Sequence, residues 1–157
     1  MTPEQPRRVR RPKDKEDLIQ SLTDGKAAVF PTYRELLIFS AALGFFHHEP
    51  KPFSGSSEPI QWSTFLGTPG EQLVDMLTAA TVADPSALGT GAEHFNRRLE
   101  LFEEYANGGL EILKKELSVS NAPADEVIRN MILSIEEIAG EEAPEPDLRE
   151  IAESLSI

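Results

Sequence analysis

The sequence has no cysteine among its 157 residues, which excludes disulfide bonds, thiolate metal sites and cysteine nucleophiles. It also has no long hydrophobic run. The longest apolar stretch, Leu36–Phe46, is interrupted by Ser40 and Gly44 and is shorter than the roughly 20 residues needed to span a bilayer. The charged N-terminus lacks the apolar segment of a signal peptide. These absences predict a cytoplasmic protein that does not associate with membranes.

Positive charge is scarce and is concentrated at one end of the chain. The formal net charge is −12, yet residues 1–16 contain six basic side chains against three acidic ones, a net charge of +3. The remaining residues therefore carry a net charge of −15. Such an asymmetry is typical of an interaction tail. We expect residues 1–12 to form a flexible basic arm, or a short strand around Val9, beside an acidic body.

Apolar residues recur at helical spacing through most of the chain, which predicts a series of amphipathic helices. Thr32 and Thr68 are each followed three residues later by a glutamate, the pattern of a capping box at a helix start. Asn107-Gly108-Gly109 should kink or break the longest helix, because two adjacent glycines cost roughly 2 kcal/mol in a helix interior. The expected helices cover residues 13–22, 32–43, 68–82, 92–117 and 124–138, with a further short helix at 147–155.

This pattern predicts a mainly α fold, with a single compact domain of five to six helices. We place the helical domain at residues 13–139, after the arm at 1–12 and before an acidic linker and short C-terminal helix at 140–157. Residues 47–60 are rich in proline and serine and are expected to form a loop, with a short strand or helical turn over 60–66.

No arrangement of residues in the sequence requires catalysis. His47, His48 and Glu49 are consecutive, whereas histidines that share a metal ion on regular structure are spaced to lie on one face. The serines near them lack the G-x-S-x-G elbow, the glycines lack the spacing of a phosphate-binding loop, and the glutamates between residues 100 and 111 are typical of a solvated helix face. We expect a protein that is not an enzyme and binds neither metal nor cofactor. A metal-dependent hydrolase using the His47–Glu49 loop is the least favoured hypothesis.

The basic segment, which carries the arginines and lysines between Arg7 and Lys15, is the feature whose chemistry most directly indicates a binding partner. Arginine binds phosphate groups bidentately, and each phosphate neutralised makes binding to DNA more dependent on salt. Two alternatives stay open: a solvated tail that aids solubility, or an arm that docks on the acidic body of its own chain or of a neighbour. The order of strand, helix, loop and helix also resembles a ribbon–helix–helix unit, which pairs strands across a dimer. The candidate nucleic-acid-binding residues are Arg7, Arg8, Arg10, Arg11, Lys13 and Lys15.

Several segments, in this order, resemble those of one family of bacterial proteins. The segments are Arg7–Glu16, Tyr33–Phe45 (YRELLIFSAALGF), Lys51–Phe53, Ser57–Trp62, Asp84–Ser86 and Phe102–Glu111. Over residues 7–117 the chain thereby resembles the DNA phosphorothioation-associated (Dnd-system-associated) protein 4 family. The resemblance implies a protein encoded beside the machinery that replaces a non-bridging phosphate oxygen of DNA with sulfur, or beside its partner restriction genes.

The resemblance favours two functions for the chain. The first is a non-enzymatic accessory protein of phosphorothioation-based modification and restriction, a form of antiviral defence, that contacts DNA through the arm. The second is an acidic adaptor or regulator of the modification or restriction complex that does not bind DNA. Self-association into a homo-oligomer stays open in both. For contact with protein partners the candidates are Trp62, Tyr105, Gly108 and Gly109, and the glycine pair predicts a close approach of the backbone to another helix or to a partner.

Overall fold

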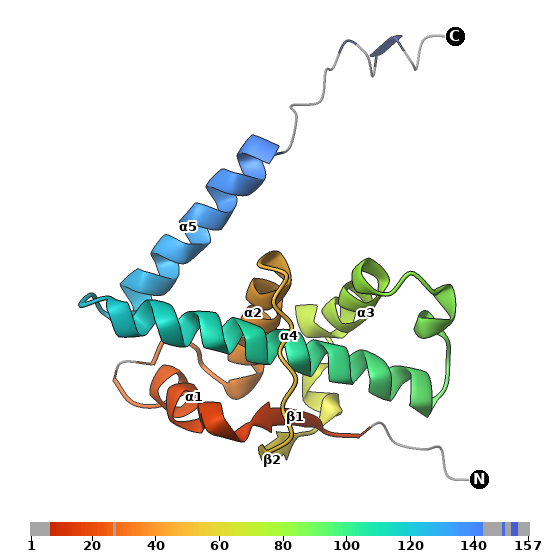
Figure 1. The fold of residues 1–157 in the computed structure, drawn as a ribbon, viewed down its shortest axis with the longest axis horizontal. Coiled ribbons are helices and arrows are strands. Elements are labelled where there is room, and N and C mark those ends of the chain that lie inside the picture. Colours follow the sequence, from red (N-terminus) through yellow and green to blue (C-terminus); the bar gives the residue numbers. More distant parts are fainter. Residues whose placement is uncertain (1–6, 27, 143–148, 150–151, 154–157) are drawn as a thin grey trace.

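The computed structural model describes residues 7–26, 28–142, 149 and 152–153 (Figure 1). The described chain is mainly helical, as predicted, and the expected helix at 147–155 lies largely outside it. No helix in this part of the chain combines the length and the apolar character needed to cross a bilayer. The elements are β1 (Val9–Pro12), α1 (Glu16–Thr23), α2 (Tyr33–Phe46), β2 (Ser56–Ile60), α3 (Pro69–Thr81), α4 (Ala92–Val119) and α5 (Ala124–Glu142), with short 3-10 helices at Lys13–Lys15, Trp62–Phe65 and Pro85–Leu88.

The core lies where α4, the longest helix, packs against α2 and α3 (Figure 1). Both predicted helix starts are confirmed: Thr32 accepts a hydrogen bond from the backbone N–H of Glu35, and Thr68 accepts one from Gly70. Each fully buried leucine or phenylalanine contributes roughly 1.5–3 kcal/mol through loss of its hydration. The largest buried apolar side chains are Ile19 and Leu22 of α1, Leu36 and Leu37 of α2, Leu77 of α3, and Leu99, Phe102, Leu110 and Leu113 of α4, together with Phe65.

Helix α4 runs without interruption through Gly108 and Gly109, so the predicted break is wrong. The glycines instead allow α2 and α4 to cross closely. A Cβ atom at Gly109 would lie 1.8 Å from the backbone oxygen of Ser40, and one at Gly44 would lie 2.1 Å from that of Tyr105. Burial against α2 outweighs the low helix propensity of glycine, because tertiary packing supplies most of the stability of helices in proteins.

The sequence predicts either a flexible basic arm over residues 1–12 or a short strand around Val9, and the structure has the strand, β1, which lies against the body. Strand β1 pairs antiparallel with β2, with Val9 opposite Ile60 and Arg11 opposite Ser57, and Val9 is fully buried. The partner strand belongs to the same chain, unlike the pairing across a dimer in a ribbon–helix–helix unit. Strand β2 lies in the segment expected to be a loop. Its Pro59 lowers the β propensity of the segment but is tolerated in a two-stranded sheet, where every strand is an edge.

Helix α5 begins near the end of α4 and points away from the rest of the molecule (Figure 1). It continues to Glu142, past Gly140, where the sequence predicts its end. Its first turns contact the body through Val127 and Ile128, which are both buried.

Candidate functional site

A buried carboxylate, that of Glu103 on α4, lies beneath the basic N-terminal segment. Its side chain has no exposed surface. The guanidinium of Arg7 donates two hydrogen bonds of 2.8 Å, one to each carboxylate oxygen. Arg10 donates from Nε at 3.1 Å and also from its backbone N–H. The hydrogen bond to Glu103 raises the pKa of Arg7 above its usual value. A charge buried in this way is tolerated because it is both paired and hydrogen-bonded.

Lys15 is buried in a second ion pair with α4. Its side chain is 1% exposed, and Nζ lies 2.9 Å from a carboxylate oxygen of Asp14 and 2.9 Å from one of Glu111. Nζ also donates to the side-chain oxygen of Asn107 at 3.3 Å. Burial by itself lowers the pKa of Lys15, but the hydrogen bonds to Asp14 and Glu111 outweigh it, so the pKa is raised. The same bond from Lys15 lowers the pKa of Glu111. Both groups are therefore charged at neutral pH.

Arg11, like Lys15, is buried by the fold. It is 6% exposed and donates from Nε to the backbone oxygen of Glu58 at 2.8 Å. Its terminal nitrogen donates to Glu16 at 3.2 Å, and the guanidinium carbon lies 4.2 Å from the centre of the Tyr33 ring. Four of the six candidate nucleic-acid-binding residues, those at positions 7, 10, 11 and 15, are thus engaged by the chain's own groups. The other two, Arg8 and Lys13, are exposed.

The candidate partner-binding residues belong mostly to the interior. Tyr105 is 4% exposed, and its hydroxyl lies 2.9 Å from that of Thr81. Gly108 and Gly109 are buried, and a Cβ atom at Gly108 would lie 1.6 Å from the backbone oxygen of Glu49. The close approach expected of this glycine pair is therefore made within the chain. Half-buried Trp62 alone among the four keeps appreciable exposed surface.

The loop that carries His47 and His48 shows no metal-binding geometry. Both histidines are exposed at the end of α2, where the backbone N–H of His47 is hydrogen-bonded to Leu43. Across the residues that the structure describes, no three histidine, aspartate or glutamate side chains gather as a metal site would require. The loop therefore gives no support to a metal-dependent hydrolase.

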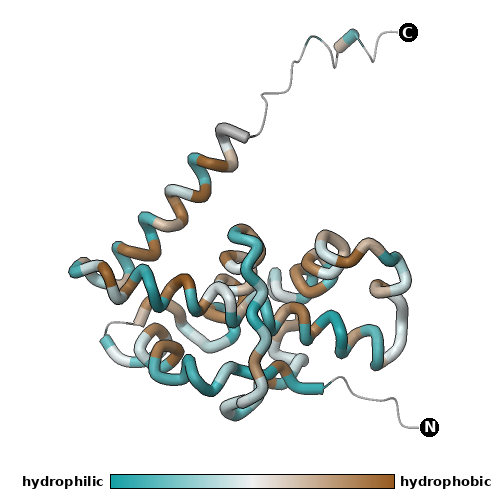
Figure 2. The backbone as a smooth tube through the Cα atoms, in the orientation of Figure 1, coloured by the Kyte–Doolittle hydropathy of each residue, from teal (hydrophilic) through white to brown (hydrophobic). Residues whose placement is uncertain are grey.

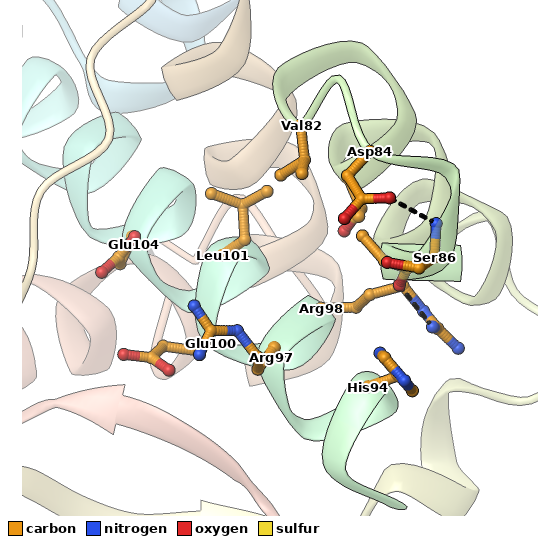
Figure 3. A pocket seen from close by; sticks show the side chains of 11 residues that line it. Val82, Asp84, Ser86, His94, Arg97, Arg98, Glu100, Leu101 and Glu104 are labelled. Carbon is orange, nitrogen blue, oxygen red and sulfur yellow. Dashed lines mark hydrogen bonds between the residues drawn. The ribbon is translucent and has the colours of Figure 1, made fainter. Parts of the chain in front are cut away.

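A cavity of about 460 Å³ lies between the end of α3, the 3-10 helix Pro85–Leu88 and the first half of α4 (Figure 3). Asp84 accepts a hydrogen bond from the backbone N–H of Ser86 at 3.0 Å, and Arg98 donates to the backbone oxygen of Ala87 at 2.8 Å. The first bond caps the 3-10 helix, and the second holds that helix against α4. Burial, together with the nearby Glu100 and Glu103 carboxylates, raises the pKa of Glu104, another lining residue.

The charges around this cavity do not select one class of ligand. Figure 3 shows His94 and Arg97 within one wall of the cavity and the carboxylates of Glu100 and Glu104 on the same helix. Along α4, Arg97 and Arg98 are followed by Glu100 and Glu104, so side chains of both charges line the cavity. A ligand of either charge would meet groups of its own sign. The cavity is therefore a weaker candidate for a ligand-binding site than the basic segment.

The sequence predicts Glu103 to be one of several solvated glutamates, whereas its side chain is fully buried. The signal was present in the helical spacing. Glu103 lies four residues after Leu99 and seven before Leu110, on the same stripe of α4 as these two buried leucines. A carboxylate on an apolar stripe must be paired, and the basic segment is the densest source of cations in the chain.

The chain is similar to a known protein family along most of its length. No curated protein and no solved structure matches the chain. The family model described as DNA sulphur modification system-associated protein 4 matches residues 8–151, from the start of the basic segment to beyond α5. This match confirms the resemblance seen in the sequence and extends it by more than thirty residues past position 117. The chain belongs to the DNA sulphur modification system-associated protein 4 family.

Proposed function

We propose that the protein is a non-enzymatic accessory component of a DNA sulphur modification system, and that it acts as an adaptor by binding partner proteins through its acidic body. Membership of the family supplies the setting. The observation that carries the adaptor role is the pairing of Arg7 and Arg10 with the buried Glu103. Three of the four arginines of the segment, Arg7, Arg10 and Arg11, already have carboxylate partners in the same chain.

An exchange of these partners for DNA phosphates would be unfavourable. Release of both arginines would leave the Glu103 carboxylate buried without a charged partner, which costs about 3–5 kcal/mol. The new contacts at the surface would each return about 1 kcal/mol or less and would weaken as salt is added. The net charge of −15 on the rest of the chain would also repel the duplex.

A second candidate function is local contact with single-stranded DNA through residues that remain exposed. Lys13 and Lys51 line an open cavity of about 470 Å³ together with Phe53. Two lysines beside an aromatic ring match the composition of grooves that bind single strands, where bases stack and cations follow the backbone. Asp14 lies in the same cavity and opposes this binding, so the adaptor role is preferred.

Binding of labelled DNA to the purified protein separates the two functions. Single-stranded and duplex DNA, each with and without phosphorothioate, would be titrated at low and at physiological salt and followed by fluorescence anisotropy. The adaptor role predicts no binding at either salt, and co-elution with a protein of the modification or restriction machinery after co-expression. Binding that falls steeply with salt and is abolished by Lys13→Glu with Lys51→Glu would overturn the adaptor role and favour DNA contact.

A further inference from the structure

Helix α5 carries an apolar stripe that is longer than the surface it covers. At its base, Val127 and Ile128 are 8% and 3% exposed. Further along the same stripe, Ile132 and Ile138 are 39% and 42% exposed. Figures 1 and 2 show the reason: the helix points away from the body, while apolar residues recur as far as its outer end. The stripe packs against the core as far as Ile135 and continues beyond it to the exposed Ile138.

The outer part of this stripe and the end of α2 form an open groove. Ile135 of α5 lines it on one side, and Phe39, Phe45 and Phe46 of α2 line it on the other. The volume is about 400 Å³, and the remaining lining residues are Ala42, Leu43 and His48. Two helices that diverge around apolar walls form the kind of groove in which a third, amphipathic helix lies. We call this feature the α2–α5 groove.

The charge of α5 indicates which kind of helix the groove suits. The helix has six acidic side chains and one basic one, Arg129, for a net charge of −5. Arg129 itself lies 4.0 Å from the carboxylate of Asp125. Glu136 is exposed about 100° around the helix from Ile135, at the flank of the apolar stripe. The α2 side of the groove ends in the exposed His47, His48 and Glu49. A second copy of this chain would bring acidic α5 residues against each other, which is unfavourable.

We propose that the α2–α5 groove binds an amphipathic helix of a partner protein, in which lysines or arginines flank the apolar face. The apolar face covers Ile135 and the phenylalanines of α2, and the basic flanks meet the carboxylates of α5. The inference rests on the proposed adaptor function, and it adds the site and the chemistry of the partner segment.

Two designed peptides of about 18 residues, long enough to form a helix on the groove, test the proposal. Both carry leucine at helical spacing; one has lysine flanks and the other has glutamate flanks. Each is labelled and titrated with the full chain, and binding is followed by fluorescence anisotropy. The lysine peptide should bind at least about tenfold more tightly, a difference of about 1.4 kcal/mol.

Substitutions on opposite sides of α5 provide the matched comparison. Ile135→Asp places a charge in the groove and should weaken binding of the lysine peptide at least about tenfold, or about 1.4 kcal/mol. Leu133→Asp changes a residue that is 50% exposed and lies off the apolar stripe, so binding should be unchanged. Ile132→Asp is a second variant on the apolar stripe, and it removes less buried surface than Ile135→Asp does. Circular dichroism of each variant shows whether α5 remains folded.

Several outcomes would overturn the groove assignment. These are failure of the lysine peptide to bind, equal binding of the two peptides, and binding that survives both stripe variants. Self-association of the chain that is lost in Ile135→Asp would assign the groove to a second copy instead. The proposed function is tested separately, because co-elution with the machinery that persists in Ile135→Asp would remove the groove and leave the adaptor role.

Discussion

Glu103 lies on a stripe of α4 otherwise occupied by buried leucines, a position where an unpaired carboxylate would be strongly destabilising. Arg7 and Arg10 reach it from a different part of the chain and supply the compensating charge. At the scale of single residues, the basic character of the N-terminal segment is therefore explained by a requirement of the fold. Phosphate recognition is not needed to account for these two arginines.

Replacing the two arginines of this ion pair should destabilise the fold more than replacing Glu103. Arg7→Met combined with Arg10→Met leaves Glu103 buried without a cation, and the loss of stability should be about 3 kcal/mol or more. Glu103→Leu should cost less, about 1 kcal/mol, because the two arginine side chains are 30% and 32% exposed and can turn to solvent. Urea unfolding of the three proteins measures both values. A larger loss in Glu103→Leu would contradict this account.

At the scale of elements, glycine usually destabilises a helix, but at the crossing of α2 and α4 it is required for the two helices to pack. Gly109→Ala should destabilise the protein by about 2–4 kcal/mol, because the added methyl group would collide with the backbone of Ser40. Gly140→Ala is the control, since a Cβ atom there meets nothing within 4 Å. That control should gain up to about 1 kcal/mol from helix propensity. Thermal and urea unfolding give the signs, and a stabilised Gly109→Ala would disprove the close crossing.

The sequence predicts elements well where local signals decide them, and less well where distant contacts do. Thr32 and Thr68 start helices as expected, because a cap acts within a few residues. Gly108 and Gly109 read locally as a helix break, and only the nearness of α2 shows why the helix continues. Strand β2 has weak β propensity of its own and is ordered by pairing with β1. The basic segment is evident in the sequence, but its position against Glu103 depends on a contact between residues that are 96 positions apart.

At the scale of the whole molecule, the body is compact and α5 extends beyond it (Figure 1). A compact domain of this length has a radius of gyration of about 15 Å. A variant that ends at Glu142 retains α5, a helix about 28 Å long, and should give a clearly larger value by small-angle X-ray scattering. Addition of the lysine-flanked peptide should leave this value nearly unchanged, because the groove exists before binding. A radius near 15 Å without peptide would mean that α5 folds back onto the body.

The pairing of Arg7 with Glu103 also has a consequence for the chain while it is being synthesised. The two residues are separated by 96 positions, so ribosomes working at about 5–20 residues per second produce the carboxylate roughly 5–20 s after the arginine. The carboxylate of Glu111 follows later still. During that interval Arg7, Arg10 and Lys15 have no carboxylate of α4 with which to pair. Completion of α4 therefore supplies the carboxylate partners that these cations lack while the chain is being synthesised.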